Sequence, residues 1–93
     1  MRKIEETTAF RRDLRRIKAS PNHRRVAVLL AEIINRLRVD VPLPERHRDH
    51  NLSGRWIGFR DCHVRPDLVL IYRKFDDVLQ LVRLRSHSEL FGR

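Results

Sequence analysis

The chain has 93 residues, and its 21 Lys and Arg residues outnumber 12 Asp and Glu residues, which gives a formal net charge of +9. This length provides for one small core, so we expect residues 1–93 to form a single domain. No apolar run approaches the roughly 20 residues of a membrane-spanning helix, and the lone Cys62 excludes an internal disulfide.

The charged residues also indicate a partner and a compartment. Eighteen of the 21 cations are Arg, whose planar guanidinium group can bind phosphate in a bidentate way. We therefore expect an anionic partner, which is a nucleic acid, an acidic protein or an anionic membrane surface. Glu5 and Glu6 stand where a signal peptide would carry its apolar stretch, so we expect a cytoplasmic protein.

The first third of the chain predicts a short strand and two helices. Residues 1–6 are compatible with a strand, and Thr7 or Thr8 can cap a following helix. That helix has an apolar stripe and a cationic outer face, because Phe10, Leu14 and Ile17 recur at helical spacing among arginines. A second helix is expected with Ser20 as N-cap, Pro21 as its first residue and an apolar stripe that ends at Leu37.

The rest of the chain predicts a long connection and a three-stranded meander. Residues 40–54 are rich in turn formers and carry His47 and His50. Strands are expected over residues 56–63, 68–72 and 78–84. The order β-α-α-β-β-β predicts an α+β domain, in which an N-terminal two-helix hairpin packs on a small antiparallel sheet.

The alternation of side chains along these strands predicts one cluster of polar residues. Asp61 and His63 share a face of their strand, and so do Arg83 and Arg85, with His87 following in phase. Antiparallel pairing brings the end of one strand beside the start of the next. The residues expected to converge at one end of the sheet are Asp61, His63, Asp67, Arg83, Arg85 and His87.

Such a cluster suits the cleavage of RNA. Histidine has an ordinary pKa of about 6.5 and can give or take a proton at neutral pH, and arginine stabilises charge that develops on a phosphoryl group. RNA supplies its own nucleophile, the 2′-hydroxyl group. We therefore expect no metal and no other cofactor, and no histidine pair has the spacing of an HExxH zinc motif.

Structural roles remain open for the same residues. A histidine at a strand end is more often a surface residue than a functional one, and Asp61 and Asp67 can simply pair with neighbouring arginines. Aromatic residues in the last half are expected in the core, namely Trp56, Phe59 and Tyr72.

A long motif in the second half resembles the YafQ branch of the RelE toxin superfamily. Residues 49–67 read DHxLxGxWxGxRDxHVxPD, residues 70–72 read LIY, and residues 87–91 read HxxLF. The resemblance implies a bacterial type II toxin with the RelE-like fold. It implies a ribosome-dependent endoribonuclease that enters the A site of the 30S subunit and cleaves mRNA, with no membrane partner.

The resemblance also implies roles for individual residues. His87 is expected to act as general acid, and His50 or His63, helped by Asp67, as the base that activates the 2′-hydroxyl group. Asp61 supports this group, and Phe91 is expected to stack on a base. The cationic pattern adds Arg83 and Arg85 as phosphate contacts. The family often has an aromatic residue where this chain has Leu68.

Partners and alternative functions follow from the same comparison. A cationic toxin of this family implies a cognate acidic antitoxin, in a heterotetrameric complex. Two other functions remain open, which are a non-enzymatic toxin that acts by protein binding, as ParE relatives do, and a plain nucleic-acid-binding module.

Overall fold

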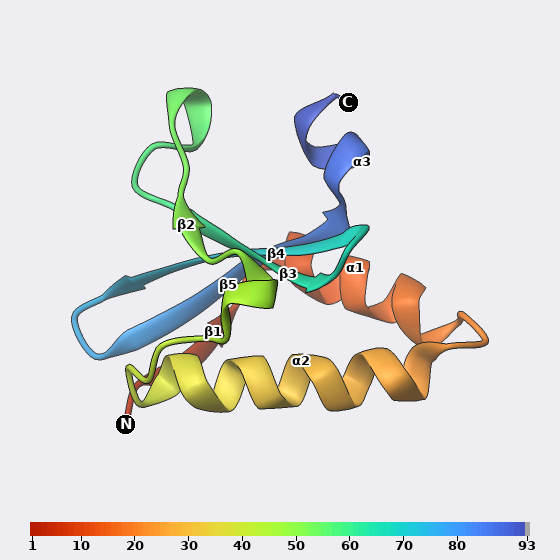
Figure 1. Ribbon diagram of the computed structural model, residues 1–93, viewed down its shortest axis with the longest axis horizontal. Coiled ribbons are helices and arrows are strands. Elements are labelled where there is room, and N and C mark those ends of the chain that lie inside the picture. The colour runs from red at the N-terminus through yellow and green to blue at the C-terminus, as the bar shows by residue number, and fades with distance from the viewer. Residues whose placement is uncertain (93) are drawn as a thin grey trace.

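The structure, a computed structural model, describes residues 1–92 and has the expected α+β class. Two helices lie against one face of a five-stranded sheet, while the segment around β2 and the C-terminal helix α3 rise from the opposite face (Figure 1). The elements in chain order are β1 (Lys3–Glu6), α1 (Thr8–Lys18), α2 (His23–Arg38), η1 (Glu45–His47), β2 (His50–Asn51), η2 (Gly54–Trp56), β3 (Arg60–Arg65), β4 (Leu68–Phe75), β5 (Val78–Ser86) and α3 (His87–Phe91).

α1 begins at its predicted cap, whereas α2 begins later than predicted. The Thr7 side chain accepts the backbone N–H of Phe10 at 3.0 Å, which confirms the predicted start of α1. The predicted start of α2 is wrong by about half a turn, since its N-cap is Asn22. Ser20 lies in the preceding turn, where its carbonyl oxygen accepts the N–H of His23 at 3.2 Å.

The sheet has the order β1-β5-β4-β3-β2 and is mixed rather than antiparallel throughout. β3, β4 and β5 form the expected antiparallel meander, whereas β1 pairs with β5 in parallel, with Lys3 opposite Val78 and Glu6 opposite Leu81. The sequence pattern identifies strands by their composition. It does not determine the direction in which two strands more than 70 residues apart will pair.

The register of the meander separates a core face from an open face. Cys62, Leu70 and Leu84 are aligned across β3, β4 and β5 and point into the core beneath the sheet, where they meet Phe10 and Ile33 of the helices. The residues one position earlier on β3 and β5 point to the opposite face because strand side chains alternate. The sheet therefore presents its polar residues on the face away from α1 and α2.

The segment before β3 is less regular than expected. β3 begins at Arg60 rather than Trp56, since a 3₁₀ turn precedes it and Gly58 adopts a positive φ of 91°. Trp56 and Phe59 are half-buried and pack edge to face with ring centroids 5.6 Å apart, so only Tyr72 of the three expected aromatics belongs to the core. Among residues 1–92, no helix is long and apolar enough to cross a membrane.

Candidate active site

The centre of the open face is a buried carboxylate surrounded by three histidines. Asp61 on β3 is only 1 % exposed, and its backbone neighbour across the β2–β3 pair is His50. Burial raises the pKa of Asp61, while the nearby imidazoles of His50, His63 and His87 act in the opposite direction. The fold thus brings together four of the predicted residues from β2, β3 and α3, although His50 lies far from His87 in the sequence.

The hydrogen bonds of His50 and His63 leave the same ring nitrogen available on each. Nδ1 of His50 lies 2.7 Å from the carbonyl oxygen of Arg48 and 3.1 Å from Oδ1 of Asp61. Nδ1 of His63 lies 3.2 Å from the carbonyl oxygen of Pro66. A carbonyl oxygen only accepts, so Nδ1 carries the proton of each neutral ring, and Nε2 keeps the lone pair that a general base needs.

A row of rings continues from His63 onto α3. The ring centroids of His63 and His87 are 6.2 Å apart, and those of His87 and Phe91 are 4.7 Å apart. His87 is exposed, so its ring can meet an incoming ligand directly. The separation of the two imidazoles allows a single phosphodiester group to contact both.

The position of α3 depends on its first residues. Ser86 and Glu89 form a reciprocal capping box, in which the Ser86 side chain accepts the Glu89 N–H and the Glu89 carboxylate accepts the Ser86 N–H. The Arg85 guanidinium also binds Glu89. The bond from Arg85, with the bonds from Ser86, lowers the pKa of Glu89 to about 2.

The position of His50 depends on a different set of contacts. The neighbouring Asp49 carboxylate accepts the hydroxyl group of buried Tyr72 at 2.5 Å and Nε of Arg60 at 3.3 Å. Arg60 also donates to the side chain of Asn51 at 2.7 Å. Burial and the bond to Asp49 raise the pKa of Tyr72, so its hydroxyl group remains a donor. β2 is therefore attached to the core through a tyrosine of β4.

Arg83 and Arg85 are engaged by acidic residues. Arg83 binds the carboxylate of Asp13 on α1 at 2.8 and 3.2 Å, and the same carboxylate accepts the N–H of Leu84 at 3.0 Å. Asp13, only 3 % exposed, thus completes the edge of β5 beyond its pairing with β1. Arg85 lies 3.9 Å from Asp13 in addition to binding Glu89. The predicted phosphate contacts of both arginines stay predictions.

Asp67 lies in the turn between β3 and β4, next to Pro66, and it is exposed. It lines a pocket of about 330 Å³ together with Arg85 and Glu89. Within residues 1–92 its carboxylate forms no hydrogen bond or ion pair with a histidine, and the carboxylate nearest to one is that of Asp61. The predicted assistance of Asp67 to the base stays a prediction.

Two features of the site escaped the sequence analysis. The contact between Asp49, Tyr72 and Arg60 joins three segments, and no local pattern announces it. The helix α3 had a detectable signal, since Ser86 and Glu89 have the S-x-x-E spacing of a capping box. Among residues 1–92, no group of three or more His, Cys, Asp or Glu side chains is arranged to hold a metal ion.

The sequence and the fold of the chain match those of small bacterial toxins. Residues 2–92 match the family model described as a bacterial toxin of a type II toxin–antitoxin system, YafQ. The chain is 36 % identical over 92 residues to the mRNA interferase toxin YafQ of Escherichia coli K12, covering 98 % of this chain and 97 % of that protein. The chain therefore belongs to the YafQ family of type II toxins.

Solved structures of relatives have the same fold. The toxin in the E. coli DinJ–YafQ complex is 35 % identical, with a TM-score of 0.79 over 99 % of this chain and 100 % of that chain. A metal-bound toxin from Helicobacter pylori is 38 % identical, with a TM-score of 0.83 over 98 % of this chain and 100 % of that chain. The mixed sheet and two main helices are thus the family architecture.

Proposed function

We propose that this chain is the toxin of a type II toxin–antitoxin system and acts as a metal-independent endoribonuclease on mRNA in the A site of the ribosome. The observation that carries the proposal is the convergence of His50, His63 and His87 around buried Asp61, in a chain of the YafQ family. The mRNA interferase name of the E. coli relative supports the same substrate.

The reaction uses the ribose of the substrate as nucleophile. Nε2 of His50 or His63 removes the proton of the 2′-hydroxyl group, whose oxygen then attacks the adjacent phosphorus. The bond from phosphorus to the 5′-oxygen breaks, and His87 gives that oxygen a proton. The products are a 2′,3′-cyclic phosphate and a 5′-hydroxyl end.

The remaining site residues support this proton transfer. Asp61 stabilises the positive charge that the base gains, since it lies 3.1 Å from His50, and Asp67 assists from the β3–β4 turn. Phe91 stacks on a base beside His87, a contact worth about 1–3 kcal/mol in single-strand binding. Arg83 and Arg85 add positive potential at the phosphate.

The partners follow from charge and from the relatives. A net charge of +9 favours entry into the RNA-rich A site of the 30S subunit and binding to mRNA. The DinJ–YafQ complex supports a cognate acidic antitoxin, with which this toxin forms a heterotetramer in the cytoplasm.

The proposal is tested by mapping 5′ ends of a defined mRNA with and without translating ribosomes. Wild-type protein gives in-frame cuts only with ribosomes, and His87→Ala gives none. His23→Ala is the matched control, since His23 lies on α2 outside the site and cleavage continues without it.

Other outcomes of the same mapping support other functions. Cuts without ribosomes indicate a freestanding ribonuclease. Growth arrest without cuts, persisting after loss of all three site histidines, indicates a toxin that acts by protein binding. Binding to RNA without cuts or growth arrest indicates a plain nucleic-acid-binding module.

A further inference from the structure

A second pocket opens beside the histidine cluster, along the outer edge of β3. It has a volume of about 610 Å³ and lies between η1 and the β3–β4 turn. His63 belongs to both the pocket and the active site, whereas His87 does not line the pocket. Besides His63, the pocket is lined by Arg46, His47, Arg48, Arg65 and Pro66.

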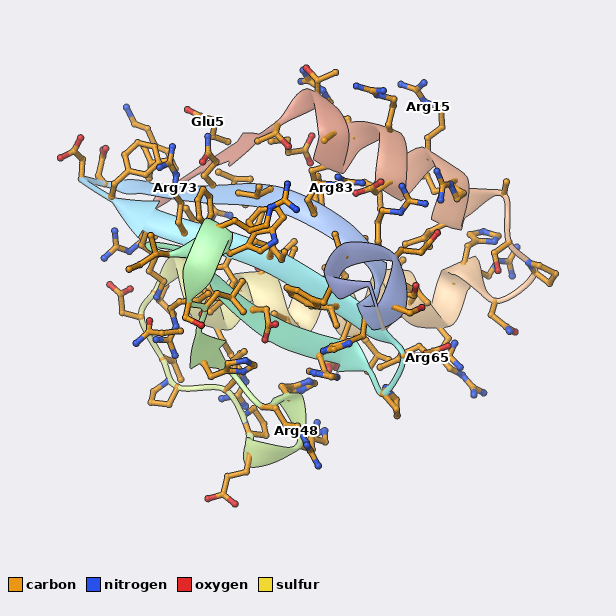
Figure 2. The ribbon with its side chains drawn as sticks, turned by 90° about the horizontal axis from the view of Figure 1, so that it is seen from above. Glu5, Arg15, Arg48, Arg65, Arg73 and Arg83 are labelled. Atoms are coloured by element: carbon orange, nitrogen blue, oxygen red, sulfur yellow. The ribbon has the colours of Figure 1, made fainter. Side chains whose placement is uncertain are left out.

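The arginines of this pocket have free guanidinium groups. Within residues 1–92, the side chains of Arg46, Arg48 and Arg65 form no ion pair and no hydrogen bond, in contrast to Arg83. Figure 2 shows Arg48 and Arg65 on the β3 side of the open face and Arg83 on the opposite side, beside α1. Unpaired positive charge next to a catalytic histidine is therefore concentrated at the β3 edge.

The strand edge in this pocket is already occupied. Nδ1 of buried His47 donates to the carbonyl oxygen of His63 at 2.7 Å, which is the acceptor that an added peptide strand would need. Pro66 has no N–H to offer such a strand. What the pocket offers a ligand is thus its guanidinium groups, and these match the oxygen geometry of phosphate.

We propose that this pocket binds the phosphodiester of the RNA substrate adjacent to the one that is cleaved, an assignment that rests on the proposed function. The scissile phosphate lies at His63 and His87, so the strand continues past His63 into the pocket, while the nucleotide on the other side meets Phe91. Arg46, Arg48 and Arg65 fix the register of the strand relative to the catalytic groups.

The test combines neutral linkages in the RNA with loss of two arginines. In two separate RNAs, a neutral methylphosphonate replaces the phosphodiester on one or on the other side of the cut. Each RNA is tested with wild-type protein and with the double variant Arg46→Gln/Arg65→Gln. Arg48 is kept because its positive φ of 48° would add a backbone effect to any substitution. Arg24→Gln/Arg25→Gln on exposed α2 is the control with equal loss of charge.

Two readouts are taken, binding of a 2′-deoxy-blocked oligonucleotide without ribosomes and cleavage of mRNA on ribosomes. Only one of the two neutral linkages, the one that lies in the pocket, is expected to have an effect. It weakens binding and slows cleavage about tenfold for both wild type and the control variant. The double variant shows the same loss of binding and cleavage with ordinary RNA, and the neutral linkage lowers neither of them further. The magnitude of its slope of log affinity against log salt falls by about 0.7, the value for the loss of one phosphate contact on a single strand.

The possible failures are distinguishable. If the double variant responds to the neutral linkages as wild type does, the pocket does not bind the phosphate. If it instead retains RNA binding and no longer co-purifies with its co-expressed antitoxin, the pocket is a protein interface and the assignment is wrong. If wild type cleaves nothing while the binding results hold, the proposed function fails and the phosphate site stands.

Discussion

The two sides of the active site carry equivalent side chains but are attached to the protein differently. His50 stands on β2, whose neighbour Asp49 accepts a hydrogen bond from Tyr72, a residue only 1 % exposed. His87 stands on α3, a five-residue helix held by a capping box and by the exposed pair of Arg85 and Glu89. Loss of an acceptor from a buried donor costs more than loss of an exposed ion pair.

The difference locates the stable and the weakly held parts of the site. The base side is part of the cooperative fold, since its anchor passes through a core residue of β4. The acid side depends on contacts at the surface, because a helix as short as α3 has little stability by itself. Loss of the base-side anchor is therefore expected to lower mainly the stability of the fold. Loss of the acid-side anchor is expected to change stability little and to act mainly on cleavage.

The largest effect is expected from the catalytic side chains themselves. His87→Ala and His50→Ala each lower single-turnover cleavage by about 10²–10⁴-fold, which is the range of general acid–base contributions. Both histidines are exposed, so the midpoint of thermal unfolding changes little. A wild-type cleavage rate in either variant would remove that residue from the mechanism.

The next effect concerns the anchor of the base side. Asp49→Ala leaves the buried Tyr72 hydroxyl group without its acceptor, removes one acceptor of Arg60, and lowers the free energy of unfolding by about 1–3 kcal/mol. Tyr72→Phe removes the donor instead and costs about 0.5–1.5 kcal/mol. Denaturant unfolding measures both values, and a larger cost for Tyr72→Phe than for Asp49→Ala would contradict the burial argument.

Asp61→Asn is expected to raise stability while it lowers activity. Burial raises the pKa of Asp61, so at neutral pH the folded state carries a charge that it disfavours, and Asn removes this cost. The advantage of the variant is present at neutral pH and shrinks as the pH falls through the folded pKa, because wild type then binds its proton. Thermal unfolding across pH checks this, and a destabilised variant at neutral pH would contradict it.

The smallest effect is expected at the anchor of the acid side. Glu89→Gln removes an exposed ion pair and lowers the free energy of unfolding by less than about 1 kcal/mol. Arg85 and Ser86 hold the pKa of Glu89 at about 2, below the ordinary value of 4.5 for a glutamate, so the difference from wild type is complete above pH 4.5 and disappears as the pH falls toward 2. Unfolding curves of both proteins over this range provide the measurement.

The sequence predicted the parts of the molecule that local patterns encode. Helical periodicity located the stripe of Phe10, Leu14 and Ile17, and strand alternation placed Asp61 and His63 on one face. These features depend on residues close together in the chain. The motif shared with the family added His50, which alternation alone does not reach.

What the sequence did not predict depends on contacts between distant segments. The parallel pairing of β1 with β5 and the use of Asp13 to bind Arg83 both join residues about 70 or more positions apart. Counting charges treated all arginines as available, whereas the fold commits Arg83 to Asp13 and leaves Arg65 unpaired within residues 1–92. Charge composition gives the class of ligand, and the fold decides which cations already have an acidic partner.

The most direct measurement replaces the ribose on the 5′ side of the mapped cut with 2′-deoxyribose in an otherwise identical mRNA on the ribosome. Because that 2′-hydroxyl group is the proposed nucleophile, cleavage at the site is lost. The matched control carries the 2′-deoxyribose one nucleotide away, is cut at the unchanged rate, and yields a 2′,3′-cyclic phosphate. Cleavage of the first mRNA at the wild-type rate would contradict the mechanism assigned to His50, His63 and His87.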